Sequence, residues 1–420
     1  MKQNDYGKAG LCCRLLNGRL SAALLIGILL IPTGCASPLQ NARNEFYSGS
    51  PDKAAEILDP NRKIAKRDRL VFLMERGLIL HHQGLYKEST STLLKASRLI
   101  ERQKIINATR QVGSLVTSEL LTEYKGEYSE RLWVHTYLMI NFLLMRNYED
   151  ALVEAKQALQ VFERYPEALS DDFFTRGLIA LCFETLGLNN DAFIEYKKLA
   201  ELMLDPTPVA RKLYQFGTEL GFQEEADLYK KYMPAEEIGR VNKTPYAELV
   251  LFISQGKSPE KIPGNIVLPP SIRFSFPQYE DSESSFFNRE IIDLSGEYFG
   301  DSISTDIGKV VRASFKKRVA GIIAKETARV AAKEVIAQKV GDESHLAVEI
   351  ILRAFFFILE EPDTRSWQTL PARLTMIRLP LEQADQNMTI SIGGEKRIIS
   401  LSDEEIRSSR RIYRSIRVYN

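Results

Sequence analysis

The chain has 420 residues, of which 44% are hydrophobic and 26% are charged. This composition is typical of a folded globular protein with room for two or three domains, and it excludes a disordered chain or a multi-span membrane protein. The 56 Lys and Arg side chains nearly balance the 55 Asp and Glu side chains, so the formal net charge is only +1. Such a chain has no global basic field for nucleic acid, and we expect no nucleic-acid partner.

The N-terminus has the pattern of a secretory signal. Residues 1–19 carry four basic side chains and one acidic one, and residues 20–31 are uncharged and apolar apart from Ser21 and Gly27. A basic region followed by a short apolar region is typical of a signal peptide. At about 1.5 Å per residue the apolar region spans only ~18 Å of a hydrocarbon core of ~30 Å, so we do not expect a transmembrane helix.

The apolar region is followed by the string Thr-Gly-Cys at residues 33–35. This string resembles a bacterial lipobox, although Pro32 stands where that pattern has an aliphatic residue, usually Leu. The resemblance implies that residues 1–34 are a lipoprotein signal peptide. It also implies that Cys35 carries the lipid, palmitate included, at the start of a tether over residues 35–40.

Ala36 follows the cysteine, and Ala rather than Asp at this position resembles the enterobacterial signal for transfer to the outer membrane. We therefore expect a protein held at the cell outer membrane by its lipid anchor and facing the periplasm. The alternative is an ordinary secretory signal with a chance cysteine.

An internal repeat fills the first half of the chain. A turn-forming residue followed five positions later by a small one recurs five times. The pairs are Gly49 and Ala54, Gly84 and Ser89, Arg146 and Ala151, Gly187 and Ala192, and Gly221 and Ala226. This spacing resembles a tetratricopeptide (TPR) array, which implies helix pairs over residues 41–235. Apolar residues at three and four spacing over residues 70–94 and 132–161 also predict helices, and an unrelated helical bundle is the alternative.

In TPR arrays the first helix of each pair lines the concave face. The candidate partner-binding residues that this resemblance places there are Val71, Met74, Leu78, His81, Trp133, Ile140 and Phe174. Most of them are apolar, and soluble proteins seldom leave so apolar a surface uncovered. Either a partner segment binds in the groove, or the second half of the chain covers it. We favour cover by the second half.

Residues 236–420 have the pattern of a mixed α+β domain. Proline, turn residues and two-residue alternation predict short strands near residues 246–254, within 262–277 (272–276 included), and near 374–379, 388–392, 397–401 and 411–419. Gly393-Gly394 predicts a hairpin turn. Helical periodicity predicts a basic helix over residues 306–340 and a second helix over residues 346–359. The fold class that we expect is mainly α, with a TPR-like array followed by a smaller α+β part.

Strings in both halves resemble a known group of proteins. They include Tyr-Lys-Gly-Glu at residues 124–127 and Asp-Thr-Arg-Ser-Trp at residues 363–367, followed by Leu370-Pro371. The chain resembles uncharacterised bacterial outer-membrane lipoproteins with TPR-like repeats, often encoded near lipoproteins that activate penicillin-binding proteins. The resemblance implies envelope protein partners, of the peptidoglycan-synthesis or secretion machinery, and supplies no catalytic residues.

No nucleophile-elbow, dinucleotide-binding or phosphate-loop string is present, and the four histidines lack metal-ligand spacing. We therefore expect no catalytic residue, no metal and no cofactor. The leading hypothesis is a non-enzymatic scaffold for protein–protein interaction in envelope assembly or cell-wall synthesis. The alternative is a cell-wall or polysaccharide-processing enzyme whose active site lies in the C-terminal half, with the carboxylates of Asp301 and Asp306 as its candidate pair.

Overall fold

The computed structural model describes residues 37–109, 122–239, 247–268, 272–280, 301–343, 350, 361–381, 387–392 and 395–419. The signal-like segment and Cys35 lie outside the described residues, and so does the predicted helix over 346–359 apart from residue 350. The fold is mostly helical with a small mixed sheet, which confirms the expected fold class at this level.

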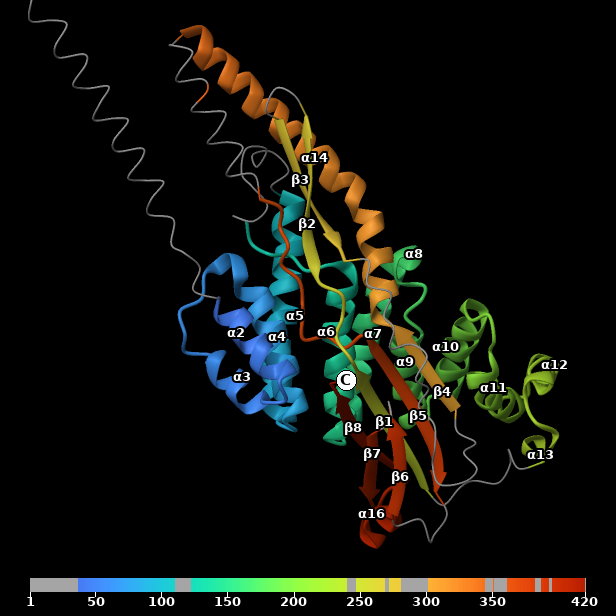
Figure 1. The fold of residues 1–420 in the computed structure, drawn as a ribbon. Coiled ribbons are helices and arrows are strands. Elements are labelled where there is room, and N and C mark those ends of the chain that lie inside the picture. Colours follow the sequence, from blue (N-terminus) through green and yellow to red (C-terminus); the bar gives the residue numbers. More distant parts are fainter. Residues whose placement is uncertain are drawn as a thin grey trace, which may run out of the picture.

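Five helix pairs follow one another along the first half (Figure 1). The pairs are α2 (Pro38–Tyr47) with α3 (Pro51–Ile57), α4 (Arg69–His82) with α5 (Tyr86–Thr109), α6 (Tyr128–Leu144) with α7 (Tyr148–Arg164), α9 (Phe173–Thr185) with α10 (Asn189–Leu202), and α11 (Thr207–Glu219) with α12 (Gln223–Asp227). Two short helices, α8 (Pro166–Leu169) and α13 (Ala235–Ile238), lie outside the pairs. Because α2 begins at Pro38, the end of the predicted tether is helical.

The turns within the pairs stand at the five predicted positions. Each has a left-handed residue, with φ of 80° at Gly49, 77° at Gly84, 59° at Arg146, 73° at Gly187 and 81° at Gly221. Each of these residues donates its backbone N–H to a carbonyl three residues earlier, which closes the preceding helix. The small residue five positions later is fully buried in every pair, so the two helices approach closely there.

The described residues of the second half form a four-stranded sheet, two hairpins, a long helix and a short one. The sheet has the order β4 (Asp301–Asp306), β5 (Arg373–Leu381), β1 (Ala247–Gln255) and β8 (Arg411–Val418). β5 is antiparallel to both β4 and β1, whereas β8 is parallel to β1. The hairpins are β2 (Lys261–Leu268) with β3 (Ile272–Tyr279) and β6 (Asn387–Ile392) with β7 (Glu395–Ser400), and the helices are α14 (Ile307–Glu343) and α16 (Asp403–Ser408). The predicted strands and the helix over 306–340 are present; β4 and α16 were not predicted.

The sheet lies across the concave face of the helical array (Figure 1). β8 contacts α4 and α6, and β4 contacts α9 and α11, so the strands follow the order of the helices that they cover. Alternation along β1 divides the apolar side chains between two cores. Val250 and Phe252 pack on the helices, while Leu249, Leu251 and Ile253 join the core beneath the β6–β7 hairpin and α16.

Helix α14 and the β2–β3 hairpin extend together away from the body (Figure 1). Near its start, α14 is tied to the array by ion pairs from Lys317 to Glu167 and from Arg318 to Glu127, the latter at 2.7 Å. Part of its basic side is thus paired within the chain. Within the described ranges, no helix combines the length and the apolar character that crossing a membrane requires.

Candidate functional site

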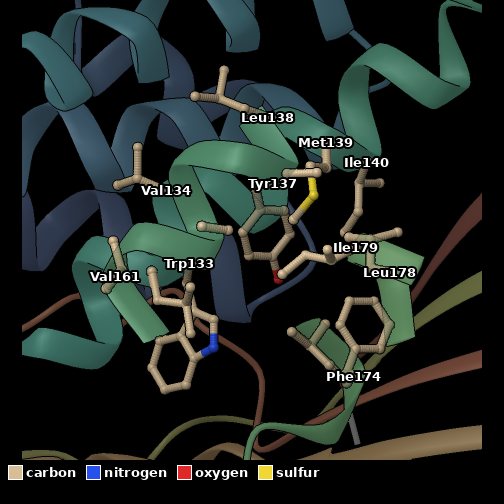
Figure 2. Close-up of a cluster of buried hydrophobic side chains, with 14 of the residues drawn as sticks. Trp133, Val134, Tyr137, Leu138, Met139, Ile140, Val161, Phe174, Leu178 and Ile179 are labelled. Atoms are coloured by element: carbon tan, nitrogen blue, oxygen red, sulfur yellow. The ribbon is translucent and has the colours of Figure 1, made fainter. Parts of the chain in front are cut away.

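All seven predicted partner-binding side chains are buried at the interface between the two halves or beneath it. None is more than 2% exposed: Val71, Met74, Leu78, His81, Trp133, Ile140 and Phe174. Figure 2 shows Trp133 and Ile140 of α6 together with Phe174 of α9 in one apolar cluster. Contact with a separate partner would need these side chains to be accessible, and in this structure they are not.

The sheet itself supplies the cover. The rings of Phe174 and Phe252 pack edge to face, with centroids 6.3 Å apart. At Gly177 an added Cβ would come within 2.8 Å of Cδ1 of Ile303 on β4, so helix α9 and the sheet approach closely there. Of the two occupants considered for the groove, the structure places the chain's own second half there.

His81 contacts the sheet through its ring nitrogens. Its Nδ1 lies 2.6 Å from Oδ1 of Asn141, and its Nε2 lies 2.9 Å from the hydroxyl of Ser415 on β8. Burial lowers the pKa of His81 to about 4, so the ring is neutral at neutral pH and can donate to Asn141 while it accepts from Ser415. This histidine joins the two halves.

A second covering element is the segment 363–370, here called the strap, which contains the Asp-Thr-Arg-Ser-Trp string. Buried carboxylates of the array accept its backbone N–H groups. The N–H of Trp367 donates to Glu130 at 2.7 Å. The N–H groups of Gln368 and Thr369 donate to Glu75 at 2.9 and 3.1 Å. The array thus binds a segment of its own chain through main-chain hydrogen bonds. Such bonds depend on the backbone conformation of the segment and not on its side chains.

Side chains of α2 and the start of α4 hold the strap from its other side. Arg43 donates to the carbonyl of Ser366 at 2.9 Å, and the hydroxyl of Tyr47 donates to that of Gln368 at 2.5 Å. Arg365 pairs with Asp363 at 2.7 Å and with Asp68 at 3.1 Å. The strap is therefore anchored along its length.

Where the sheet ends beside α9 and α11, the two halves meet in a group of charged side chains, here called the charged cluster. It consists of Glu184, Lys212, Glu248, Arg378 and Arg411. Arg378 binds Glu184 through two hydrogen bonds of 2.7 and 2.8 Å and Glu248 through two of 2.9 and 2.8 Å. Lys212 lies 2.9 Å from Glu184, and Arg411 lies 2.8 Å from Glu248. Two acids from different halves thus share three bases.

The electrostatics of the charged cluster keep it ionised. Burial alone would raise the pKa of Glu184, but the charges of Arg378 and Arg411 hold that pKa well below its usual value. Burial would also raise the pKa of Glu248, but the charges of Arg378, Lys212 and Arg411 lower it. Arg378 is only 3% exposed, and the two carboxylates raise its pKa. The cluster is a fixed set of charges that joins the halves.

A cavity of about 510 Å³ opens beside the charged cluster. Its walls come from the turn ends of two helix pairs, α11, the end of the sheet and residues 408–411. The volume lies within the range of about 300–1,000 Å³ that is typical of small-ligand sites. Unlike the covered concave face, this site is open to solvent.

The carboxylates proposed for the enzyme alternative do not form a pair. Asp301 and Asp306 are the first and last residues of β4, about 16 Å apart along the strand at about 3.3 Å per residue. Paired glycosidase carboxylates lie roughly 5 to 9.5 Å apart. In addition, Asp306 accepts the backbone N–H of Lys309 and caps the start of α14. This candidate pair was wrong, because the strand that separates the two residues was not foreseen.

The sequence carried a signal for the charged cluster that the sequence interpretation missed. Glu248 and Arg378 each stand in a mostly apolar strand, at positions that alternation assigns to the face that packs on the helices. A charge at such a position requires a partner.

In the part of the chain that the structure describes, no group of three or more His, Cys, Asp or Glu side chains is arranged to hold a metal ion.

Comparisons with known proteins show only distant structural likeness. No family model matches the chain, and neither does any curated protein. Solved structures that it resembles include MamA AMB-1, with a TM-score of 0.32, 16% identity and cover of 48% of this chain and 90% of that one. MamA RS-1 ArsTM double mutant has a TM-score of 0.33, 15% identity and cover of 50% and 99%. A structural similarity this weak does not indicate a function.

Proposed function

We propose that the protein is a lipid-anchored envelope lipoprotein that acts as a non-enzymatic, TPR-like scaffold for protein–protein interaction. The observation that carries the scaffold role is the array of five helix pairs, because repeat arrays build extended surfaces for partners. Its concave face is occupied by the sheet and the strap. A partner therefore binds at the outer helices, at the edges of the array or at the open cavity.

The anchor is proposed from the lipobox-like string that ends at Cys35. Helix α2 begins at Pro38. A lipid on Cys35 would hold the start of the array within a few residues of the membrane surface. The proposed location is the periplasmic side of the outer membrane, and the proposed partners are envelope proteins of cell-wall synthesis or secretion.

Replacement of Cys35 by alanine is expected to release the protein from membranes. Each buried CH₂ of an acyl chain contributes about 0.8 kcal/mol to membrane binding, so two or more chains give durable anchoring that the variant lacks. The measurement is fractionation of cells followed by a high-salt wash. Cys13→Ala, within the proposed signal peptide, is the matched control and should stay in the membrane fraction. Retention of Cys35→Ala after the wash would refute the lipoprotein assignment.

The scaffold role is tested by crosslinking in living cells with identification of the crosslinked protein. A photo-reactive residue at the exposed Arg146 or Arg410 is expected to capture a defined envelope protein. The same residue at the exposed Arg102 of α5 is the control. Turnover of peptidoglycan or glycan strands by the purified protein would contradict the non-enzymatic role.

A further inference from the structure

The open cavity beside the charged cluster has an excess of basic side chains. Six of its lining residues are Arg or Lys, and three are Glu. Arg378, Arg411 and Lys212 are bound to carboxylates of the charged cluster. The third acid, Glu219, accepts hydrogen bonds from the amides of Asn189 and Gln215. The acids of the cavity are thus already satisfied by groups within the chain.

Three arginines remain for a ligand: Arg146, Arg211 and Arg410. Arg146 and Arg410 are exposed at the mouth of the cavity, and Arg211 is half-buried. Among the residues that the structure describes, no hydrogen bond or ion pair engages any of these three guanidinium groups. They come from the α6–α7 turn, from α11 and from the residue just before β8, so they surround the cavity instead of forming one surface stripe.

Arg146 also carries an unusual backbone conformation. In the other four helix pairs the left-handed turn residue is glycine, and only here is it a residue with a side chain, with φ of 59°. A side chain in this conformation costs about 1 kcal/mol or more relative to glycine. Glycine would adopt this backbone conformation without strain, yet the chain has arginine here. We therefore infer that the arginine side chain has a function. Here that side chain lines the cavity.

We propose that this cavity binds an acidic peptide segment of a partner protein, with the carboxylates of the peptide on Arg146, Arg211 and Arg410. The proposal names the chemistry of a partner and so rests on the proposed scaffold role. Guanidinium groups bind carboxylates through paired hydrogen bonds, the arrangement that Arg378 already makes with Glu184 and Glu248. The three arginines lie around a cavity of about 510 Å³. This arrangement is better suited to several carboxylates on one peptide than to a single small ion.

The test is binding of a fluorescent hexaglutamate peptide to the full chain in detergent, measured by anisotropy, with hexaglutamine as the neutral control. The double variant Arg211→Gln/Arg410→Gln is expected to weaken hexaglutamate binding by at least about tenfold, since two charge-assisted contacts are lost. Arg146→Gly is expected to weaken binding severalfold without lowering the unfolding temperature, because glycine relieves the turn. Arg102→Gln on α5 is the matched control and should bind as the unchanged protein does.

The proposal is overturned if hexaglutamate binds no better than hexaglutamine, or if the arginine variants bind it as well as Arg102→Gln does. Tighter binding of free citrate than of the peptide would overturn the assignment to a partner segment. Stronger competition by inorganic phosphate than by citrate would overturn the preference for carboxylate. All of these outcomes concern the purified protein, so they are independent of the membrane-release test on Cys35→Ala.

Discussion

Replacement of Arg378 by alanine is expected to lower the free energy of unfolding by about 3–5 kcal/mol. Arg378 is the one base in the charged cluster that binds Glu184 and Glu248 through two hydrogen bonds each. Its loss leaves the carboxylate of buried Glu184 and that of half-buried Glu248 with fewer compensating charges. Removing one partner from a buried ionic group costs far more than the net contribution of the group to stability. Equilibrium denaturation by urea measures the effect.

The matched control is Arg414→Ala on β8. Arg414 also pairs with a carboxylate, Glu405 at 2.6 Å, but both side chains are about one-third exposed. Pairs of this kind contribute about 0–1 kcal/mol, so the control should lose less than 1 kcal/mol. Similar losses for Arg378→Ala and Arg414→Ala would show that the charged cluster does not hold the two halves together.

Truncation of Trp367 to alanine is expected to lower the free energy of unfolding by about 3–5 kcal/mol. The indole is 1% exposed and packs near Tyr137 of α6, with ring centroids 5.9 Å apart. Its removal leaves a cavity between the strap and the array. The strap would then detach more often, and proteases should cleave the variant there sooner than the unchanged protein.

Leu228→Ala serves as the control for Trp367→Ala, because Leu228 is an apolar side chain that is 65% exposed. We expect it to change the stability by no more than about 0.5 kcal/mol. If Trp367→Ala were equally mild and equally resistant to proteolysis, the strap would not be an integral part of the covered face.

Local features of the sequence predicted the helical array. The glycines at the turns and the small residues five positions later act within one helix pair, so their spacing sets the turn without help from distant residues. Helix α14 and strand β8 were likewise predicted from the local spacing of their apolar residues.

Features set by distant residues could not be predicted in this way. The parallel pairing of β1 with β8 joins residues more than 150 positions apart in the sequence, and nothing local specifies the partner. The charged cluster could not be predicted for the same reason, because Glu184 and Arg378 come from different halves. The sequence showed that the concave face needed cover, whereas the sheet and the strap that provide it became visible only in the structure.

In the structure, the second half covers the concave face of the array. The most direct measurement compares residues 37–239, expressed alone, with the full chain by sedimentation and by urea denaturation. We expect the fragment to self-associate, or to unfold at a lower urea concentration than the full chain, because Val71, Trp133 and Phe174 lose their cover. A fragment that stays monomeric and is as stable as the same region in the full chain would contradict this expectation.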